Sequence, residues 1–233
     1  MPSASPIILI LGAGSNIGKG VAQAFTSKGY KVALASRSQK EADSTPEQLH
    51  IRSDFANTDD VFYAFTRTKK ELGVPSVVVY NAGAFTAPPS ADDPLNITLA
   101  GFNTDMNINV TSAFIAAQQA AFGFADLPAD AAKSFFYTGN ILNISIIPKL
   151  MDAGMGKAAA AHMINASAAA YKDKGYKFYY VDERKADGSA RFQVSGEAHG
   201  AHMLELAHEK SQGPWLQSFV KGTGYKDFGP YKL

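Results

Sequence analysis

A glycine-rich turn near the start of the chain has the composition of a phosphate-binding loop. It reads ILILGAGSNIGKG and lies between an apolar run and the first amphipathic run. Glycines let the backbone turn tightly and approach a pyrophosphate, while the N–H groups that open the next helix carry partial positive charge. A turn that binds nothing is the alternative interpretation. The residues predicted to bind the phosphates are Gly12, Gly14, Ser15, Asn16, Ile17 and Gly18.

The residues after the second apolar run indicate which dinucleotide fits. The segment VALASRSQK carries no carboxylate that could hold a ribose 2′-hydroxyl, and Ser36 and Arg37 stand in its place. These side chains suit a 2′-phosphate better, so the predicted cofactor is NADP(H), with Ser36 and Arg37 in its site. A solvated loop arginine is the alternative, because arginines are common on protein surfaces.

The composition excludes several classes of protein. With 233 residues, 46% of them hydrophobic, the chain can fold as one domain with a sizeable core. A formal net charge of +1 gives no reason to expect a nucleic acid or an anionic membrane as partner. The chain has no cysteine, which excludes disulfides and permits a reducing compartment. We therefore expect a cytoplasmic protein that acts on a small molecule.

The apolar runs are too short to cross a membrane. The first, PIILIL, lacks a basic leader and continues directly into the glycine-rich turn, so we expect a strand and not a signal peptide. No run approaches the ~20 residues that a membrane span requires.

Short apolar runs alternate with longer amphipathic runs, which is typical of βαβ units around a parallel sheet. Strands are predicted at residues 7–11, 31–35, 48–53, 76–80, 135–138 and 177–181. Helices are predicted at residues 18–28, 58–72, 101–122 and 156–172. The predicted fold class is α/β, a doubly wound parallel sheet (Rossmann fold), in a single NAD(P)-binding domain that spans residues 1–233.

The pattern changes after Val181, and residues 182–233 form an atypical C-terminal segment. The stretch DERKADGSARFQVSG is polar, with an Asp187-Gly188 turn between two extended runs, which predicts a hairpin. A helix is expected at 197–210 and a last strand at 215–220.

The motifs resemble, in order and spacing, those of the short-chain dehydrogenase/reductase family from about Pro6 to Lys172. The glycine-rich turn is similar to the family's Thr-Gly-x-x-x-Gly-x-Gly, with Leu11 in place of the Thr and Asn16 in place of the middle Gly. Asn adopts the left-handed conformation more readily than most residues, so we expect the turn to survive this replacement.

The resemblance implies further site residues. Asp54 matches the acid that contacts adenine in the family, and Asn109 matches its active-site Asn. Lys157 matches the family's lysine, which holds the ribose of the nicotinamide and lowers the pKa of a neighbouring Tyr. A solvated lysine at a helix start is the alternative for Lys157. The residues implied to steady the sheet beside the cofactor are Asn81, Ala82 and Gly83.

The family's catalytic Ser and Tyr have no counterpart in this sequence. The Ser position falls on Gly139 and the Tyr position on Ala153, and no Tyr stands four residues before a Lys anywhere in the chain. Asp182 and Glu183 replace a Pro-Gly pair that follows the sixth strand in the family. A reductase without a positioned acid typically loses ~10²–10⁴ in rate, which a pre-activated substrate could tolerate. The predicted catalytic residues are therefore only Asn109 and Lys157.

Four residues could replace the missing proton donor: Asp152, Tyr137, Tyr80 and His162. Simpler interpretations exist for three of them. Tyr80 and Tyr137 lie on predicted buried strands as core aromatics. His162 stands five residues after Lys157 and so faces a different side of the helix.

A histidine cluster occurs near the C-terminus. In GEAHGAHMLELAHEK, His199, His202, Glu205 and His208 follow one another at spacings of three. Imidazoles and a carboxylate on one helical face can bind zinc. The pattern is not His-Glu-x-x-His, so we predict no metal and interpret the run as the polar face of a surface helix.

The sequence also predicts self-association. The stretch KAAAAHMINASAAAY places small residues around much of the helix that carries Lys157. In the family this helix and the one with the active-site Asn commonly form the dimer face. We expect a homo-oligomer, a dimer or a tetramer. Packing of the small residues against the sheet is the alternative.

Two functions from different classes stay open. The first is an NADPH-dependent reductase that transfers a hydride to a small organic carbonyl, imine or activated alkene, with an atypical or absent proton donor. The second is a protein that binds NADP(H) without turning it over, as a sensor, a regulator or a templating pocket.

Overall fold

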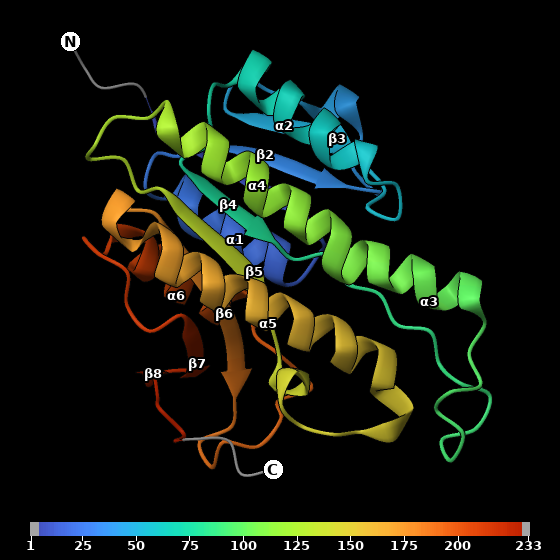
Figure 1. Ribbon diagram of the computed structural model, residues 1–233. Helices are drawn as coiled ribbons and strands as arrows, with labels where there is room; N and C mark the ends of the chain where they lie inside the picture. The colour runs from blue at the N-terminus through green and yellow to red at the C-terminus, as the bar shows by residue number, and fades with distance from the viewer. Residues whose placement is uncertain (1–4, 230–233) are drawn as a thin grey trace.

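The structure of the protein, a computed structural model, describes residues 5–229. Within them lies one eight-stranded sheet in the order β3-β2-β1-β4-β5-β6-β7-β8 (Figure 1). The strands from β1 to β7 are parallel, and β8 pairs with β7 in the antiparallel direction. The strands are β1 (Ile7–Leu11), β2 (Lys31–Ser36), β3 (Gln48–Arg52), β4 (Val77–Tyr80), β5 (Ser134–Thr138), β6 (Lys177–Arg184), β7 (Leu216–Val220) and β8 (Gly224–Tyr225).

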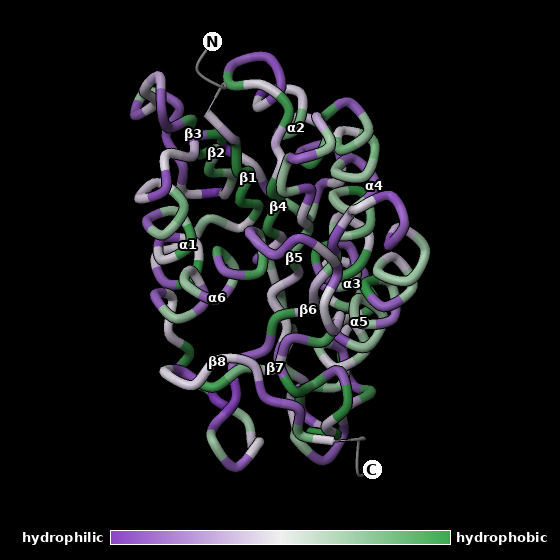
Figure 2. The backbone as a smooth tube through the Cα atoms, turned by 90° about the vertical axis from the view of Figure 1, so that its left-hand side faces the viewer, coloured by the Kyte–Doolittle hydropathy of each residue, from purple (hydrophilic) through white to green (hydrophobic). Residues whose placement is uncertain are grey.

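Helices cover both faces of the sheet, which gives three layers (Figure 2). One face carries α1 (Ile17–Thr26) and α6 (Gly196–His208), and the other carries α2 (Asp59–Glu71), α3 (Leu99–Met106), α4 (Ser112–Ala125) and α5 (Met151–Tyr171). None of the helices in residues 5–229 is long and apolar enough to cross a membrane. The predicted fold class, a doubly wound α/β sheet in a single domain, is confirmed.

The central strands are buried on both faces, which explains why they read as continuous apolar runs. Every residue of β1 and of β4 is buried. A parallel strand covered by helices on both sides needs apolar side chains in both directions, so its sequence does not alternate. The predicted strands therefore agree with the observed ones to within a few residues.

Two elements near the site differ from their predicted bounds. α5 begins at Met151 and not at residue 156, so Lys157 lies in its second turn and not at its start. Gly154 and Gly156 interrupt the apolar pattern there, which hides the first turn from a sequence reading. β6 continues to Arg184, three residues beyond the predicted end.

The C-terminal segment is simpler than the prediction of a hairpin. A single antiparallel bridge joins Arg184 and Ala190 around the turn at Asp187 and Gly188. Gly188 has a φ of +84°, a left-handed conformation that favours glycine. β8 was not expected, because two residues are too few to produce a pattern.

Glycines bring α1 and α6 into backbone contact. A Cβ on Gly20 would lie 2.1 Å from the carbonyl oxygen of Gly196, and a Cβ on Gly200 would lie 2.4 Å from that of Gly20. Any larger side chain would separate the helices. This packing places the start of α6 directly beside the glycine-rich turn that begins α1.

Candidate functional site

The glycine-rich turn follows β1 and has two tight positions and one open one. Gly12 has a φ of +89°, and a Cβ there would lie 2.3 Å from the backbone nitrogen of Ala82. A Cβ on Gly18 would lie 2.7 Å from the Cα of Ala13. Gly14 has no atom closer to its Cβ position than 4.0 Å. The chain therefore turns tightly while the side of the turn above Gly14 stays open.

Asn16 does not adopt the left-handed conformation that the sequence suggested. Its φ is −102° and its ψ is −92°, so the expected reason for an Asn at this position is wrong. Its side chain instead bridges to the start of α6. Oδ1 accepts a hydrogen bond from the Gly196 nitrogen at 3.0 Å, and Nδ2 donates to the Val194 carbonyl at 3.1 Å.

A groove of about 350 Å³ runs from this turn across the carboxyl ends of the neighbouring strands. It brings together residues from the ends of β1, β2, β3 and β4 that are far apart in the sequence. The predicted residues that line it are Gly12, Gly14, Ser36, Arg37, Asp54, Asn81, Ala82 and Gly83. The residues that the sequence did not single out are Ser38, Ser53, Phe55 and Ile108. Their adjacency to predicted positions is the only signal that could have found the first three.

Hydrogen bonds fix the two ends of the groove. Gln39 Nε2 donates to the carbonyl of Ala13 at 3.0 Å, which ties the loop after β2 to the glycine-rich turn. Asn81 Nδ2 donates to the carbonyl of Gly12 at 2.8 Å, which ties the end of β4 to the same turn. Arg37 and Asp54 are exposed on the groove wall, where their charged groups are available to a ligand.

Asn109 is buried and holds the loop that follows β4. Its Oδ1 accepts a hydrogen bond from the nitrogen of Ala84 at 3.0 Å, and its Nδ2 donates to the carbonyl of Ala84 at 2.9 Å. It lies in a π-helical turn, Asn107–Thr111, between α3 and α4. Such turns leave backbone carbonyls without their usual helical partners.

Three stacked tyrosines lie side by side in β4, β5 and β6. Ring centroids are 5.9 Å apart between Tyr80 and Tyr137 and 5.7 Å apart between Tyr137 and Tyr180. The hydroxyls of Tyr80 and Tyr137 donate to the carbonyls of Ile108 and Asn109 in the π-helical turn. All three tyrosines are fully buried, and burial raises their pKa values. Tyr80 and Tyr137 are therefore core aromatics that brace the turn.

Lys157 lies at the carboxyl end of β5 and is not a freely solvated lysine. Its Nζ donates to the carbonyl of Thr138 at 2.9 Å and to the hydroxyl of Tyr137 at 3.3 Å, and it lies 4.6 Å from the centroid of that ring. Burial lowers the pKa of Lys157 to about 8, and the carboxylate of Asp182 opposes this shift. Because Tyr137 also bonds Asn109, both predicted catalytic residues belong to one hydrogen-bonded chain.

Comparisons with known proteins identify the family to which this chain belongs. A family model described as enoyl-(acyl carrier protein) reductase matches residues 12–207. The short chain dehydrogenase/reductase dmxR12 of a Cryptosporiopsis species is 45% identical over 240 residues, with 96% of this chain and 95% of that protein covered. The chain belongs to the short-chain dehydrogenase/reductase family.

Two further comparisons cover different shares of the chain. The 3-oxoacyl-[acyl-carrier-protein] reductase MabA of Mycobacterium bovis is 34% identical over 122 residues, which cover 52% of this chain and 46% of that protein. The solved structure of a short-chain dehydrogenase/reductase from Serratia marcescens superposes with a TM-score of 0.72 at 18% identity, over 95% of this chain and 99% of that one. This structural likeness supports the fold. Members of the short-chain dehydrogenase/reductase family bind nicotinamide cofactors.

The position matched to the family's Ser has no room for a side chain. A Cβ on Gly139 would lie 2.0 Å from Cε1 of Tyr180, so the tyrosine ring fills the space that a serine would need. The hydroxyl of Tyr180 donates to the carbonyl of Asn140 at 2.8 Å and accepts a hydrogen bond from its nitrogen at 3.2 Å. Gly139 and Tyr180 therefore form a matched pair.

The position matched to the family's Tyr is Ala153, one turn before Lys157 on α5. Its neighbour Asp152 is buried and accepts a hydrogen bond from the Thr86 nitrogen at 3.1 Å. Burial raises the pKa of Asp105 on α3, and the adjacent Asp152 adds to this rise. Asp152 thus holds the loop after β4 rather than lying free beside Lys157. His162, another candidate donor, is exposed.

The Pro-Gly pair of the family is replaced by two buried acids on an extended β6. Asp182 pairs with Arg184, and burial raises the pKa of Asp182 to about 6, against the lowering effect of Arg184 and Lys157. Glu183 accepts a hydrogen bond from the Ser195 nitrogen at 2.6 Å and pairs with Arg191 at 2.9 Å. These contacts fasten the connection between β6 and α6, residues 185–195.

Two of the clustered histidines pack in the interior. His199 and His202 are buried on α6, with ring centroids 5.0 and 4.5 Å from that of Phe219 on β7. Their interpretation as a polar surface face is therefore wrong, because α6 turns this side toward the sheet. Burial lowers the pKa of both histidines. Among residues 5–229 no group of three or more His, Cys, Asp or Glu side chains is placed to hold a metal ion.

Proposed function

We propose that the protein is an NADPH-dependent reductase that transfers a hydride to a small organic carbonyl, imine or activated alkene. The observation that carries this proposal is that the groove and Lys157 lie at the carboxyl ends of neighbouring parallel strands. The groove beside the glycine-rich turn extends across the strand ends as far as Asn81, Ala82 and Gly83 after β4. The ammonium group of Lys157 is held at the end of the neighbouring strand β5. One elongated ligand could contact both ends.

The residues present fit a dinucleotide phosphate. The open position at Gly14 lets a pyrophosphate approach the backbone, and the first turn of α1 presents N–H groups that have no partners inside the helix. Ser36 and Arg37 would hold the 2′-phosphate, and Asp54 would contact the adenine. NADPH supplies the hydride when bound. The other residues assigned to its site are Gly12, Ser15, Asn16, Ile17, Gly18, Asn81, Ala82, Gly83 and Lys157.

We assign two roles to Lys157: it binds the ribose of the nicotinamide, and it donates the proton to the substrate. With a pKa of about 8, Lys157 is protonated at neutral pH. This pKa is also close enough to neutral pH for the lysine to release the proton. A general acid works best when its pKa lies near the working pH. Asn109 and Tyr137 position this lysine, because Tyr137 bonds both its Nζ and the carbonyl of Asn109.

The name of one relative supports our choice among the three substrate classes. The Mycobacterium bovis protein is named as a reductase of a 3-oxoacyl group, which is a carbonyl compound. We therefore favour a carbonyl over an imine or an activated alkene as the acceptor. The cytoplasmic location and the homo-oligomeric state, a dimer or a tetramer, stay predictions.

A non-redox NADP(H)-binding protein is the second candidate function. Ala153 and Gly139 at the two catalytic positions favour it, because neither can hold a substrate oxygen. In that case the groove would bind the cofactor, and the protein would act as a sensor, a regulator or a templating pocket.

NADPH oxidation, followed by absorbance against a panel of ketones, imines and enones, tests the proposal. We expect turnover with at least one carbonyl compound, and binding of NADPH at least tenfold tighter than NADH. Arg37→Ala should weaken NADPH binding by about 1.5–3 kcal/mol without changing NADH binding. Equal affinities of the two cofactors would overturn the assignment of Arg37. Tight NADPH binding without turnover on any acceptor would favour the non-redox function.

A further inference from the structure

A chain of side-chain hydrogen bonds joins β3 to the glycine-rich turn. Nε2 of Gln48 lies 2.9 Å from Nε2 of His50, and Nδ1 of His50 lies 2.6 Å from Oε1 of Gln39. Gln39 Nε2 then donates to the carbonyl of Ala13 at 3.0 Å. We call Gln39, Gln48 and His50 the His50 network. All three side chains are half-buried, so water does not replace these bonds freely.

The direction of each bond in the His50 network follows from the groups that meet. A carbonyl oxygen only accepts, so the amide nitrogen of Gln39 faces Ala13 and its amide oxygen faces His50. That amide oxygen also only accepts, which places the hydrogen of the imidazole on Nδ1. Nε2 is then an acceptor, and the amide nitrogen of Gln48 donates to it. One tautomer of His50 therefore satisfies the whole network.

Gln39 closes the loop that carries the residues assigned to the 2′-phosphate. Its backbone nitrogen donates to the carbonyl of Ser36 at 3.3 Å, so Arg37 and Ser38 lie inside one turn. Its Nε2 also donates to the hydroxyl of Ser36 at 3.3 Å. The place of this hydroxyl, and of the turn from which Arg37 projects, therefore depends on where Gln39 is held.

His50 acts on this loop from outside the groove. Ser36, Arg37 and Ser38 line the groove, whereas neither Gln39 nor His50 belongs to its lining. A long polar side chain gives up its rotamer freedom only where contacts hold it. The bond from Nδ1 of His50 supplies such a contact for Gln39.

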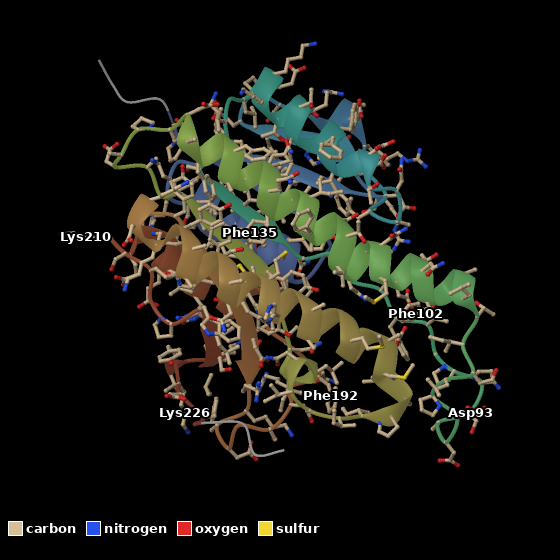
Figure 3. All side chains as sticks on the ribbon, viewed as in Figure 1. Asp93, Phe102, Phe135, Phe192, Lys210 and Lys226 are labelled. Atoms are coloured by element: carbon tan, nitrogen blue, oxygen red, sulfur yellow. The ribbon has the colours of Figure 1, made fainter. Side chains whose placement is uncertain are left out.

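The His50 network lies at one edge of the sheet, because β3 is the edge strand. Figure 3 shows Phe192 and Lys226 at the opposite side of the molecule. Substitutions in the network therefore change the loop after β2 without touching the half of the molecule that contains β6, β7 and β8.

We propose that His50 is a positioning residue for the 2′-phosphate: it holds Gln39, and through it Ser36 and Arg37, so that the protein prefers NADPH to NADH. This inference rests on the proposed function, because it takes the loop after β2 as the site of the 2′-phosphate. It adds a residue of β3 that determines cofactor preference without lining the groove.

Two substitutions separate the two contacts of His50. The amide nitrogen of an asparagine can stand near the position of Nδ1, and that of a glutamine near the position of Nε2. His50→Asn therefore keeps a donor for Gln39, whereas His50→Gln loses it. Both variants should fold, because the backbone of His50 stays paired with β2 and a cavity of about 670 Å³ beside the side chain leaves room.

Fluorescence titration of each protein with NADPH and with NADH measures the preference. We expect His50→Gln to weaken NADPH binding about 2- to 12-fold, the range for loss of one hydrogen bond, and to leave NADH binding unchanged. His50→Asn should bind both cofactors like the wild type. An unchanged preference in folded His50→Gln protein, or the same loss in both variants, would overturn the proposal. Equal weakening of the two cofactors would also contradict it, since that result indicates a general structural effect.

Neighbouring variants test whether His50 acts through Gln39. Gln48→Met is the matched control: it removes the other bond of His50 and should leave the preference unchanged. Gln39→Met removes the link itself and should weaken NADPH binding at least as much as His50→Gln does. Adding His50→Gln to Gln39→Met should cause no further loss, because both act through one contact. Additive losses would mean that His50 does not act through Gln39.

Nitrogen NMR of isotope-labelled histidine tests the network without any cofactor. The His50 signal is identified by its absence from the His50→Asn protein, and we expect its hydrogen on Nδ1. A hydrogen on Nε2 would overturn the proposal.

The outcomes also separate this proposal from the reductase. NADPH preference that depends on His50, in a protein that reduces no acceptor, would support the His50 network and reject the reductase. NADPH-dependent turnover with a cofactor preference that His50→Gln leaves unchanged would support the reductase and reject the His50 network.

Discussion

Lys157 differs from a surface lysine in two physical respects. Hydrogen bonds to Thr138 and Tyr137 fix its ammonium group at the end of β5, and burial lowers its pKa to about 8. The opposing influence of Asp182 comes from a carboxyl that is itself raised to a pKa of about 6 by burial. Because Asp182 is ionised above this value, the two residues carry opposite charges at neutral pH. At the scale of single residues, this is the charged pair on which the proposed proton transfer depends.

The pH dependence of turnover should report Lys157. If protonated Lys157 supplies the proton, kcat/KM for a ketone should be constant below pH 8 and fall about tenfold per pH unit above it, because the acid is lost as pH rises through its pKa. Lys157→Ala should lower kcat by ~10²–10⁴ and remove this fall. Lys157→Arg is the matched control, since arginine keeps the charge at all accessible pH values. If the pH dependence of kcat/KM were the same in the Lys157→Ala protein, the lysine would be excluded as the acid.

Gly139 and Tyr180 should be energetically coupled. Gly139→Ser forces a side chain into the ring of Tyr180 and should lower the free energy of unfolding by about 1–3 kcal/mol, the usual effect of overpacking. Tyr180→Ala alone should lower it by about 3–5 kcal/mol through the cavity that it leaves. In the double variant the serine enters that cavity, so the combined loss should be smaller than the sum. Denaturant unfolding of the four proteins measures the coupling, and strictly additive losses would argue against it.

At the scale of elements, the contact between α1 and α6 positions the glycine-rich turn at one end of the groove. Gly20, Gly196 and Gly200 allow the two helix backbones to touch, and Asn16 joins the start of α6 to the glycine-rich turn. The connection after β6 is held by Glu183. The hydrogen bonds of Asn16 to the start of α6, and not a left-handed backbone conformation, therefore explain why this position of the turn is Asn and not Gly.

Gly20→Ala should lower the free energy of unfolding by about 1–3 kcal/mol, because the new Cβ would meet the backbone carbonyl of Gly196, which cannot move without shifting a helix. Gly154→Ala is the matched control. The nearest atom to a Cβ at Gly154 is 3.6 Å away, so helix propensity should raise stability by about 0.5–1 kcal/mol. Thermal or denaturant unfolding compares the two. A Gly20→Ala protein as stable as the wild type would show that the helices are not in backbone contact.

The sequence predicted the elements better than it predicted the contacts between them. Buried parallel strands appear in the sequence as apolar runs, so the strands β1 to β7 and the α/β class were predicted without a structure. The contact of Gly139 with Tyr180 could not be predicted, because the pairing of β5 with β6, and not closeness in the sequence, brings the residue after β5 against the ring of Tyr180.

At the scale of the whole molecule, exposed apolar side chains on α4 offer a surface for the predicted self-association. On α4, Phe114 is 51% exposed and Phe122 is 62% exposed. Both lie on one helical side, eight residues apart, and large apolar residues on a surface mark interaction sites when they are grouped. Small residues of α5 line part of the same layer, where α4 and α5 are neighbours (Figure 1).

Light scattering at micromolar concentration should give a mass of at least twice 24.8 kDa. Phe114→Ser combined with Phe122→Ser should shift the protein toward the monomer, because each removes an apolar contact from the proposed face. Phe62→Ser on α2, where the side chain is 41% exposed, serves as the control and should leave the mass unchanged. A monomeric wild-type protein would reject the prediction.

Transfer of deuterium tests the central claim most directly. NADPH that carries deuterium on one face of its nicotinamide C4 is incubated with the protein and a panel of ketones, and the alcohol products are analysed by mass spectrometry. If the protein is a reductase, product should form only in its presence, with one deuterium in each molecule from one face of the cofactor and none from the other. Product without deuterium from either face, or no product above the protein-free level while NADPH stays bound, would contradict the account.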